Sequence, residues 1–340
     1  IPGNLPQIGD PLPTCVYVDR CPIATEICST EAPPIVERTE GGHWTRCHHP
    51  ERINEVPDPQ ETDWEHDIGT EEIIGVHGVS KTFHQRGVDV PALVSVDLGF
   101  ADGETLGLVG ESGSGKSTLA KTMLGVHAPD EGGQITLRGR PMKGKATERV
   151  EESIRAMQMV FQNPDSALNR AWTVRRILTR SVSKLTGLKG EEADKRAREI
   201  ATGMRLSARH LDMRPRQLSG GLKQRVAIAR AFAGDPEVVV CDEPTSALDV
   251  SVQAAILNLL ANLQRTERTS YLFISHDIGV VRYLFDRVAV MYVGRLMVLA
   301  TTDMMFEGPN DPYTEALLSA VPSVDGKAEN RIPLSGEIPW

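Results

Sequence analysis

Three short, largely apolar runs divide the chain, at residues 106–109, 237–241 and 271–275. Glycine or polar residues follow each run, and a stretch of helical composition comes next. Continuous apolar runs of this kind are typical of strands buried on both faces of a parallel sheet, with helices in the connections. The pattern therefore predicts an α/β fold.

A different pattern, alternation with a period of two, covers residues 92–100. It places Val94, Val96 and Leu98 on one side of a strand, as expected for a sheet with one buried face. Further strands are expected at 73–76, 79–83, 134–138, 156–161, 288–292 and 296–300. The last two flank a Val-Gly-Arg turn and predict a hairpin.

Segments of helical composition fill much of the remaining chain. The longest, 173–206, interrupts the alternation of strands and helices, so we expect it to form a smaller helical subdomain. Other helices are expected at 119–124, 147–155, 222–233, 252–264, 277–285 and 312–320. No apolar run approaches the roughly 20 residues that a membrane-spanning helix needs.

The charge of the chain is concentrated in one segment. The 340 residues are typical of about two domains, and their formal net charge is −9. Residues 51–72 hold nine acidic residues and one basic residue, so they carry −8 of that charge and are expected to form a solvated linker. The rest is almost neutral, which argues against a sequence-independent nucleic-acid-binding protein because such proteins present a basic face.

A glycine-rich segment lies between the run at 106–109 and a segment of helical composition. It comprises Gly110, Glu111, Ser112, Gly113, Ser114, Gly115, Lys116, Ser117 and Thr118. A strand followed by a loop of this kind and then by a helix is typical of a phosphate-binding site. Glycine lets consecutive backbone N–H groups point at the phosphate oxygens, and the N-terminus of the helix adds positive charge. We expect Lys116 to reach the β- and γ-phosphates and the Ser117 hydroxyl to bind Mg²⁺.

Polar residues end several strands at the sheet edge where folds of this class bind ligands. Asp242 and Glu243 follow a buried run. We expect Asp242 to hold Mg²⁺ and Glu243 to act as general base toward water. Gln162 and His276 end two other strands. Gln162 is a candidate for contact with the metal or the water, and His276 for contact with the γ-phosphate.

A second anion site is expected at Ser219, Gly220 and Gly221, which begin a different helix. One ATP molecule needs only one phosphate loop, so this second site is expected to serve a nucleotide held by a partner.

Residues 1–50 are rich in proline and cysteine and lack a hydrophobic period. A segment of this length is too small to be stabilised by its own hydrophobic core, so it needs cross-links such as disulfides or a bound metal, or a surface to pack against. Cys15, Cys21, Cys28 and Cys47 are compatible with metal or iron–sulfur ligation, with disulfides or with a structural role. The phosphate loop in the same chain favours a reducing compartment and hence ligation, whereas the absence of C-x2-C pairs weakens zinc.

Taken in order, these motifs resemble an ABC-transporter ATPase cassette over residues 73–320. The resemblance implies a P-loop fold with a RecA-like core, an antiparallel β subdomain and a helical subdomain. It implies a head-to-tail pair of cassettes, in which each signature at Ser219–Gly221 closes on the ATP of the other. It also implies that Phe83 stacks on adenine and that Asp249 belongs to the nucleotide site. Leu222 departs from the family, where many members have glutamine.

A narrower resemblance is to the C-terminal extension of oligopeptide/dipeptide importer ATPases. It rests on the segment Pro312–Leu318 and on the spacing of the four cysteines. The resemblance implies that Cys15, Cys21, Cys28 and Cys47 ligate a [4Fe-4S] cluster.

The Ile-Pro segment at residues 1–6 is echoed at 332–339. Together with the narrower resemblance, this echo suggests a piece of a fused two-cassette ATPase. In this prediction residues 1–50 are the extension of a preceding cassette, 51–72 a linker, 73–320 the second cassette and 321–340 the start of a second extension.

The resemblance implies a subunit that binds and hydrolyses ATP with Mg²⁺ to energise a di/oligopeptide importer. Its expected partners are a second cassette, possibly in the same parent chain, two membrane-spanning permease subunits and, indirectly, an extracytoplasmic substrate-binding protein, but no nucleic acid. The expected location is peripheral, on the cytoplasmic face of a bacterial or archaeal membrane. A non-transport ABC ATPase and an importer of nickel chelates or glycosides are the alternatives.

Overall fold

The computed structural model describes residues 14–15, 18, 21, 23–39, 43–55, 66–85 and 87–319. The chain divides into two compact units, Ile1–Glu65 and His66–Trp340. Segment 321–340, the predicted second extension, lies outside the described residues. Within the described ranges, no helix is long and apolar enough to span a membrane.

The first unit has few elements and little core. Its elements are α1 (Glu26–Thr30), the antiparallel pair β1 (Ile35–Thr39) and β2 (His43–Arg46), and the 3-10 helix η2 (Pro50–Glu55). Among its described residues only Ile23 and Cys28 are buried hydrophobic residues. The unit therefore has too little apolar contact to be stabilised by a core alone. Because η2 reaches residue 55, the first residues of the predicted linker are helical.

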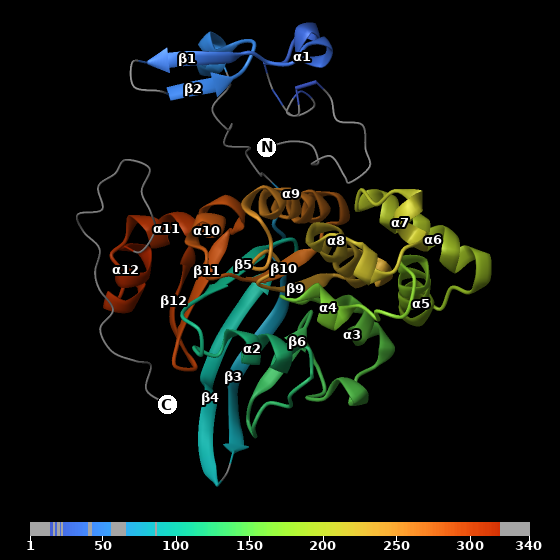
Figure 1. Cartoon of the computed structure of the whole chain (residues 1–340). Helices are drawn as coiled ribbons and strands as arrows, with labels where there is room; N and C mark the ends of the chain where they lie inside the picture. Colours follow the sequence, from blue (N-terminus) through green and yellow to red (C-terminus); the bar gives the residue numbers. More distant parts are fainter. Residues whose placement is uncertain are drawn as a thin grey trace. The chain divides into compact units, whose positions relative to one another are not determined.

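A six-stranded sheet forms the centre of the second unit (Figure 1). Its order is β12-β11-β5-β10-β9-β8, and only the hairpin β11–β12 is antiparallel. The strands are β5 (Thr105–Val109), β8 (Met157–Val160), β9 (Val238–Asp242), β10 (Ser270–Ile274), β11 (Arg287–Tyr292) and β12 (Arg295–Thr301). Every residue of β5 and β10 is buried, which confirms the prediction of strands covered on both faces.

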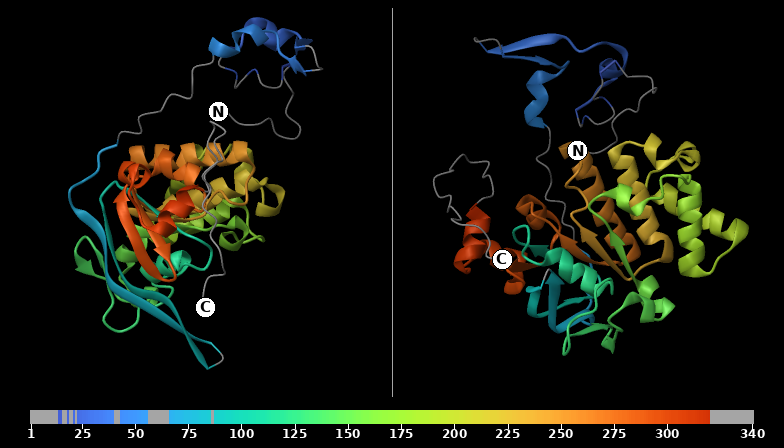
Figure 2. Two further views of the ribbon diagram at one scale, coloured as in Figure 1. Left: turned by 90° about the vertical axis from the view of Figure 1, so that its left-hand side faces the viewer. Right: turned by 60° about the horizontal axis from the view of Figure 1, so that its bottom comes forward.

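A four-stranded antiparallel sheet has the order β4-β3-β6-β7. Figure 2 shows the long ribbon of β3 (Glu72–Gln85) and β4 (Val88–Ala101). The short strands β6 (Gln134–Leu137) and β7 (Arg140–Pro141) continue the sheet beside β3.

The prediction that Val94 shares a buried face with Val96 and Leu98 is wrong. Ser95 has a φ of 46°, and Leu93 rather than Val94 is buried. The β3–β4 pairing also shifts in register in this region. One residue outside the extended conformation moves the preceding side chains to the opposite face of the sheet.

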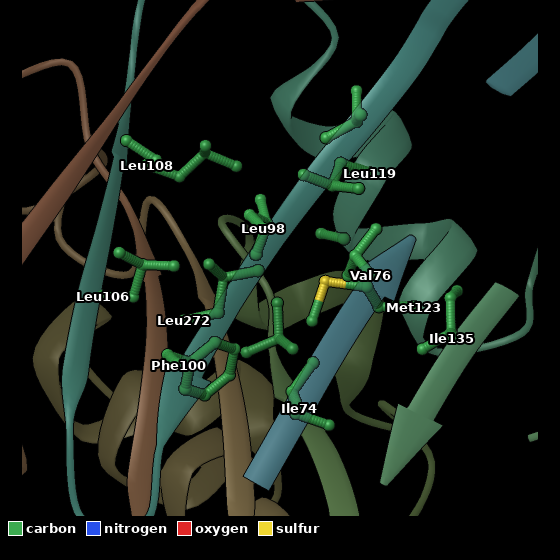
Figure 3. Close-up of a cluster of buried hydrophobic side chains, with 14 of the residues drawn as sticks. Ile74, Val76, Leu98, Phe100, Leu106, Leu108, Leu119, Met123, Ile135 and Leu272 are labelled. Carbon is green, nitrogen blue, oxygen red and sulfur yellow. The ribbon is translucent and has the colours of Figure 1, made fainter. Parts of the chain in front are cut away.

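The hydrophobic core of the second unit joins the two sheets and the helix α2 (Lys116–Met123). Its members labelled in Figure 3 are Ile74, Val76, Leu98, Phe100, Leu106, Leu108, Leu119, Met123, Ile135 and Leu272. The phosphate-loop helix is thus packed by its apolar side, which fixes the position of its N-terminus.

The predicted helical subdomain contains α5 (Val174–Thr186), α6 (Gly190–Gly203) and α7 (Ala208–Asp212). In Figure 1 these helices form a group beside the main sheet. The remaining helices are α3 (Glu151–Ala156), α4 (Pro164–Ala167), α8 (Gly220–Ala231), α9 (Val250–Glu267), α10 (Ile278–Leu284), α11 (Thr302–Glu307) and α12 (Pro312–Ser319). The helix predicted over 147–155 is interrupted, because Arg149 and Val150 are extended.

Candidate functional site

The loop from β5 to α2 depends on two glycines. Gly110 has a φ of 145° and Gly115 a φ of 105°, both in the region that favours glycine. A Cβ atom at Gly110 would lie 2.2 Å from the Met291 carbonyl oxygen, and one at Gly115 would lie 2.6 Å from the Ala92 carbonyl oxygen. Backbone conformation and crowding therefore both require glycine here. At the tip of the loop, Ser112 and Gly113 are exposed.

The Lys116 side chain lies across the inside of the loop. Its Nζ donates to the carbonyl oxygens of Gly110 and Glu111, each at 2.7 Å, and to Ser114 Oγ at 3.2 Å. Burial lowers the pKa of Lys116, although the nearby carboxylates of Glu243, Asp242 and Glu111 oppose that change. The ammonium group is thus held beside the loop by weak neutral acceptors, which a phosphate can replace.

Asp242 and Ser117 provide oxygen ligands at the base of the loop. Ser117 Oγ donates to Asp242 Oδ1 at 3.2 Å, and this contact joins the first turn of α2 to the end of β9. The pKa of Asp242 is raised, chiefly by burial and further by the charge of Glu243, although the bond from Ser117 and the charges of Lys121 and Lys116 oppose that change. A hydroxyl and a carboxylate are the oxygen donors that Mg²⁺ prefers, so the residues present fit a magnesium ion.

Glu243 follows β9 and brings two predicted residues together. Gln162 Nε2 donates to Glu243 Oε2 at 2.9 Å, and His276 Nδ1 lies 3.2 Å from the same oxygen. Glu243 has a φ of 45°, which is strained for a residue with a side chain. The three residues end neighbouring strands β8, β9 and β10, as the strand order predicts. The arrangement holds the carboxylate at the sheet edge beside the loop.

Phe83 lies on β3, where it is half-buried. Its ring meets His127 edge to face, with centroids 5.2 Å apart, and Lys81 Nζ lies 5.8 Å from its centroid. Asp130 fixes this strand by accepting from Lys81 Nζ at 3.1 Å and from the Thr82 N–H at 2.7 Å. The ring is therefore held in place by its neighbours.

The predicted signature lies apart from these contacts. Ser219 caps α8 by accepting from the Leu222 N–H at 3.4 Å, and a Cβ at Gly221 would lie 2.6 Å from Val252 Cγ1. Ser219 and Gly220 are exposed, as is Asp249 at the start of α9. Among the described residues, no hydrogen bond joins the signature to the loop at 110–118. The structure does not bring these residues into the site of their own chain.

The four cysteines of the first unit are free thiols. The Cys15 N–H donates to the Cys28 carbonyl at 3.1 Å, and the His49 N–H lies 3.3 Å from Cys47 Sγ. Even so, the described residues contain no group of three or more His, Cys, Asp or Glu side chains placed to hold a metal ion. The cluster site predicted at Cys15, Cys21, Cys28 and Cys47 is not formed in this structure.

Two contacts at the site were not predicted from the sequence. The Glu111 N–H of the loop donates to Tyr313 Oη at 2.9 Å, and Lys223 Nζ of α8 donates to Asp165 Oδ2 of α4 at 3.0 Å. In the sequence, Tyr313 stands out only as a member of the segment Pro312–Leu318. No spacing in the sequence indicates either contact, because both join elements that meet only through tertiary packing.

Two family profiles match the chain. The one described as "ABC transporter" matches residues 93–246. The one described as "Oligopeptide/dipeptide transporter, C-terminal region" matches two segments, 1–28 and 299–339.

Similar proteins include the oligopeptide transport ATP-binding protein AppF of Bacillus subtilis (strain 168), 40% identical over 264 residues, which are 76% of this chain and 80% of that protein. The di/tripeptide transport ATP-binding protein DppF of Pseudomonas aeruginosa (strain UCBPP-PA14) is 40% identical over 262 residues, 77% of this chain and 81% of that protein.

Among solved structures, CbiO1 of Clostridium perfringens, part of an ABC transporter complex, aligns with a TM-score of 0.62 and 26% identity, over 70% of this chain and 91% of that one. A dimeric ATP-binding cassette in a post-hydrolysis state, bound to ADP and Pi, aligns with a TM-score of 0.59 and 30% identity, over 67% of this chain and 98% of that one. These likenesses confirm the predicted cassette fold. The chain belongs to the family of ABC-type ATPases, in the group of oligopeptide/dipeptide transport ATP-binding proteins.

Proposed function

We propose that this chain hydrolyses ATP to drive import of di- or oligopeptides through a membrane-spanning permease. The observation that carries the proposal is the glycine loop with Lys116 inside it and Glu243 beside it, in a chain whose segment 299–339 matches the peptide-transporter region. The relatives named above are peptide-transport ATP-binding proteins, which favours peptides over nickel chelates, glycosides or a non-transport role.

In this proposal Lys116 leaves the loop carbonyls and binds the β- and γ-phosphates. Ser117 and Asp242 hold Mg²⁺, which neutralises phosphate charge when bound; Gln162 is a further candidate ligand. Glu243 accepts a proton from the attacking water. Gln162 and His276 keep its carboxylate oriented, and His276 also contacts the γ-phosphate. Phe83 stacks on adenine.

Ser219, Gly220, Gly221 and Asp249 act on the nucleotide of a second cassette in this proposal. The exposure of Ser219, Gly220 and Asp249 supports that role. So does the lack, among the described residues, of a hydrogen bond from the signature to the loop at 110–118. The partners would be that second cassette, two permease subunits and, indirectly, a substrate-binding protein, at the cytoplasmic face of the membrane.

The test is reconstitution of the chain with its permease in vesicles. Hydrolysis stimulated by a peptide-loaded binding protein, with peptide uptake that depends on ATP, is the expected result. ATP hydrolysis that no permease and no peptide stimulates would contradict the transport role and favour a non-transport ATPase. Uptake of a nickel chelate or glycoside in place of peptide would revise the substrate.

We also propose that residues 1–50 are the extension of a preceding cassette and 73–320 a second cassette, with 51–72 as the linker. The profile that matches 299–339 also matches 1–28, which supports two copies of the same region. Sequencing the transcript that encodes this chain tests the proposal. A reading frame with a second phosphate loop upstream of residue 1 is expected, and an upstream frame that encodes no cassette would contradict it.

The [4Fe-4S] cluster remains a separate proposal. Four free thiols lie in one small unit, and backbone contacts link Cys15 with Cys28. Ligation would require their side chains to converge from the positions seen here. Anaerobic purification with iron and sulfide analysis tests it: a brown protein with about four irons per chain is expected, and a colourless, iron-free protein would reject the cluster.

A further inference from the structure

Helix α12 brings a tyrosine from the C-terminal region onto the phosphate loop. The Glu111 N–H donates to Tyr313 Oη at 2.9 Å, across 202 residues of sequence. The Tyr313 side chain is largely buried, with 9% of the residue exposed, and its ring centroid lies 4.5 Å from that of Tyr292 on β11. The hydroxyl therefore approaches the loop from a ring that packs against the main sheet.

The start of α12 is fixed by its own hydrogen bonds. Asp311 Oδ1 accepts from the N–H groups of Tyr313 at 2.9 Å and Thr314 at 3.2 Å, and Asp311 Oδ2 accepts from Thr314 Oγ1. Thr314 is fully buried, and Glu315 Oε1 accepts from the Asn310 N–H at 3.0 Å. These bonds fix the backbone on either side of Tyr313, and the contact of its ring with Tyr292 places the side chain against β11.

Tyr313 and Lys116 hold opposite edges of one peptide group. The Gly110 carbonyl accepts from Lys116 Nζ at 2.7 Å, and the N–H of the same peptide bond, on Glu111, donates to Tyr313. In a trans peptide the C=O and N–H point in opposite directions, so Lys116 lies inside the loop and Tyr313 outside it. Glycine at position 110 leaves this peptide group free to rotate unless it is held.

We propose that Tyr313 is a positioning residue for nucleotide binding. The inference rests on the proposed role of Lys116, which must release the Gly110 carbonyl to reach phosphate. Once Lys116 has released that carbonyl, the bond from the Glu111 N–H to the Tyr313 hydroxyl is the one hydrogen bond that still holds this peptide group among the described residues. It keeps the loop in the conformation that binds phosphate, and the segment that marks the peptide-transporter group thereby forms part of the ATP site.

The test compares Tyr313→Phe with Tyr271→Phe in the full chain. Phenylalanine at 313 keeps the ring packing on Tyr292 and removes only the hydroxyl. The control also loses one hydroxyl bond, from the buried Tyr271 Oη to the Leu260 carbonyl at 3.0 Å, in the core between β10 and α9. For Tyr313→Phe we expect the Kd and KM for MgATP to rise about three- to ten-fold, as for one neutral hydrogen bond, with kcat unchanged.

Tyr271→Phe is expected to lower the Tm without changing the Kd for MgATP. An unchanged Kd in Tyr313→Phe would overturn the proposal, and so would an equal rise in Kd in both variants, because that rise would reflect general destabilisation. Failure of the unaltered chain to bind MgATP would overturn the proposed function as well. Binding by the unaltered chain with no effect of Tyr313→Phe would overturn this inference alone.

Discussion

Two helix N-termini of the second unit carry glycines and a hydroxyl, yet their surroundings are opposite. At α2 the inside of the loop is filled by Lys116, which is buried and bonded to loop carbonyls, and Ser117 is bonded to Asp242. At α8 Ser219 caps its own helix and faces solvent. In the proposed function this difference has a consequence: the loop before α2 binds the phosphates of the chain's own ATP, whereas the N-terminus of α8 acts on a nucleotide held by a second cassette.

The largest expected effect is at Glu243. Glu243→Gln removes the general base, so the rate of ATP hydrolysis should fall about 10²- to 10⁴-fold, while MgATP binding persists. Glu237→Gln is the matched control, since Glu237 lies just before the opposite end of β9 and pairs with Arg138. A phosphate-release assay on both variants tests this prediction, and normal turnover by Glu243→Gln would contradict the assignment of the base.

The next largest effect is expected for Lys116→Ala. Charge-assisted bonds to the phosphates are lost, so the Kd for MgATP measured by calorimetry should rise about 10- to 100-fold. Lys184→Ala, at an exposed lysine of α5, should leave the Kd unchanged. An unaltered affinity in Lys116→Ala would count against the loop at 110–118 as the nucleotide site.

The variant Ser219→Ala distinguishes the roles of the two helix N-termini most clearly. The monomer should keep its affinity for MgATP, whereas ATP-dependent association with a second cassette, followed by light scattering, should weaken about ten-fold. Thr173→Ala removes the comparable cap of α5, where Thr173 accepts from the Arg176 N–H. If both variants associate equally poorly, loss of a helix cap explains the effect and the anion-site role is wrong.

The smallest effect concerns the ion pair between Lys223 of α8 and Asp165 of α4. Both side chains are mostly buried, with 20% and 26% exposed. A double-mutant cycle with Lys223→Gln and Asp165→Asn should give a coupling free energy of about 0.5–1 kcal/mol in urea unfolding. A coupling of zero would show that the pair does not link the signature helix to the segment after Gln162.

The sequence was sufficient for the parts of the fold that local patterns determine. The buried strands, the loop at 110–118 and the grouping of Gln162, Glu243 and His276 follow from apolar runs and from the rule that strand ends share a sheet edge. The burial of Leu93 instead of Val94 did not follow, because a single positive φ at Ser95 is invisible to an alternation pattern.

Tertiary packing determined what the sequence could not predict. Tyr313 reaches Glu111 only because α12 packs beside β11. The cysteines differ from this case, because spacing and family resemblance predict a cluster although the described side chains are not placed to hold a metal ion, so the cluster stays a proposal. The spacing of residues in the sequence shows which side chains could serve as ligands. Whether those side chains lie close together depends on the folded structure.

Hydrogen–deuterium exchange of the full chain, with and without MgATP and at a concentration where it is monomeric, tests the difference between the two helix N-termini directly. The account predicts that nucleotide slows amide exchange at residues 110–118 and leaves residues 219–223 unchanged. Slower exchange at residues 219–223 in the monomer on addition of nucleotide, or unchanged exchange at residues 110–118, would contradict it.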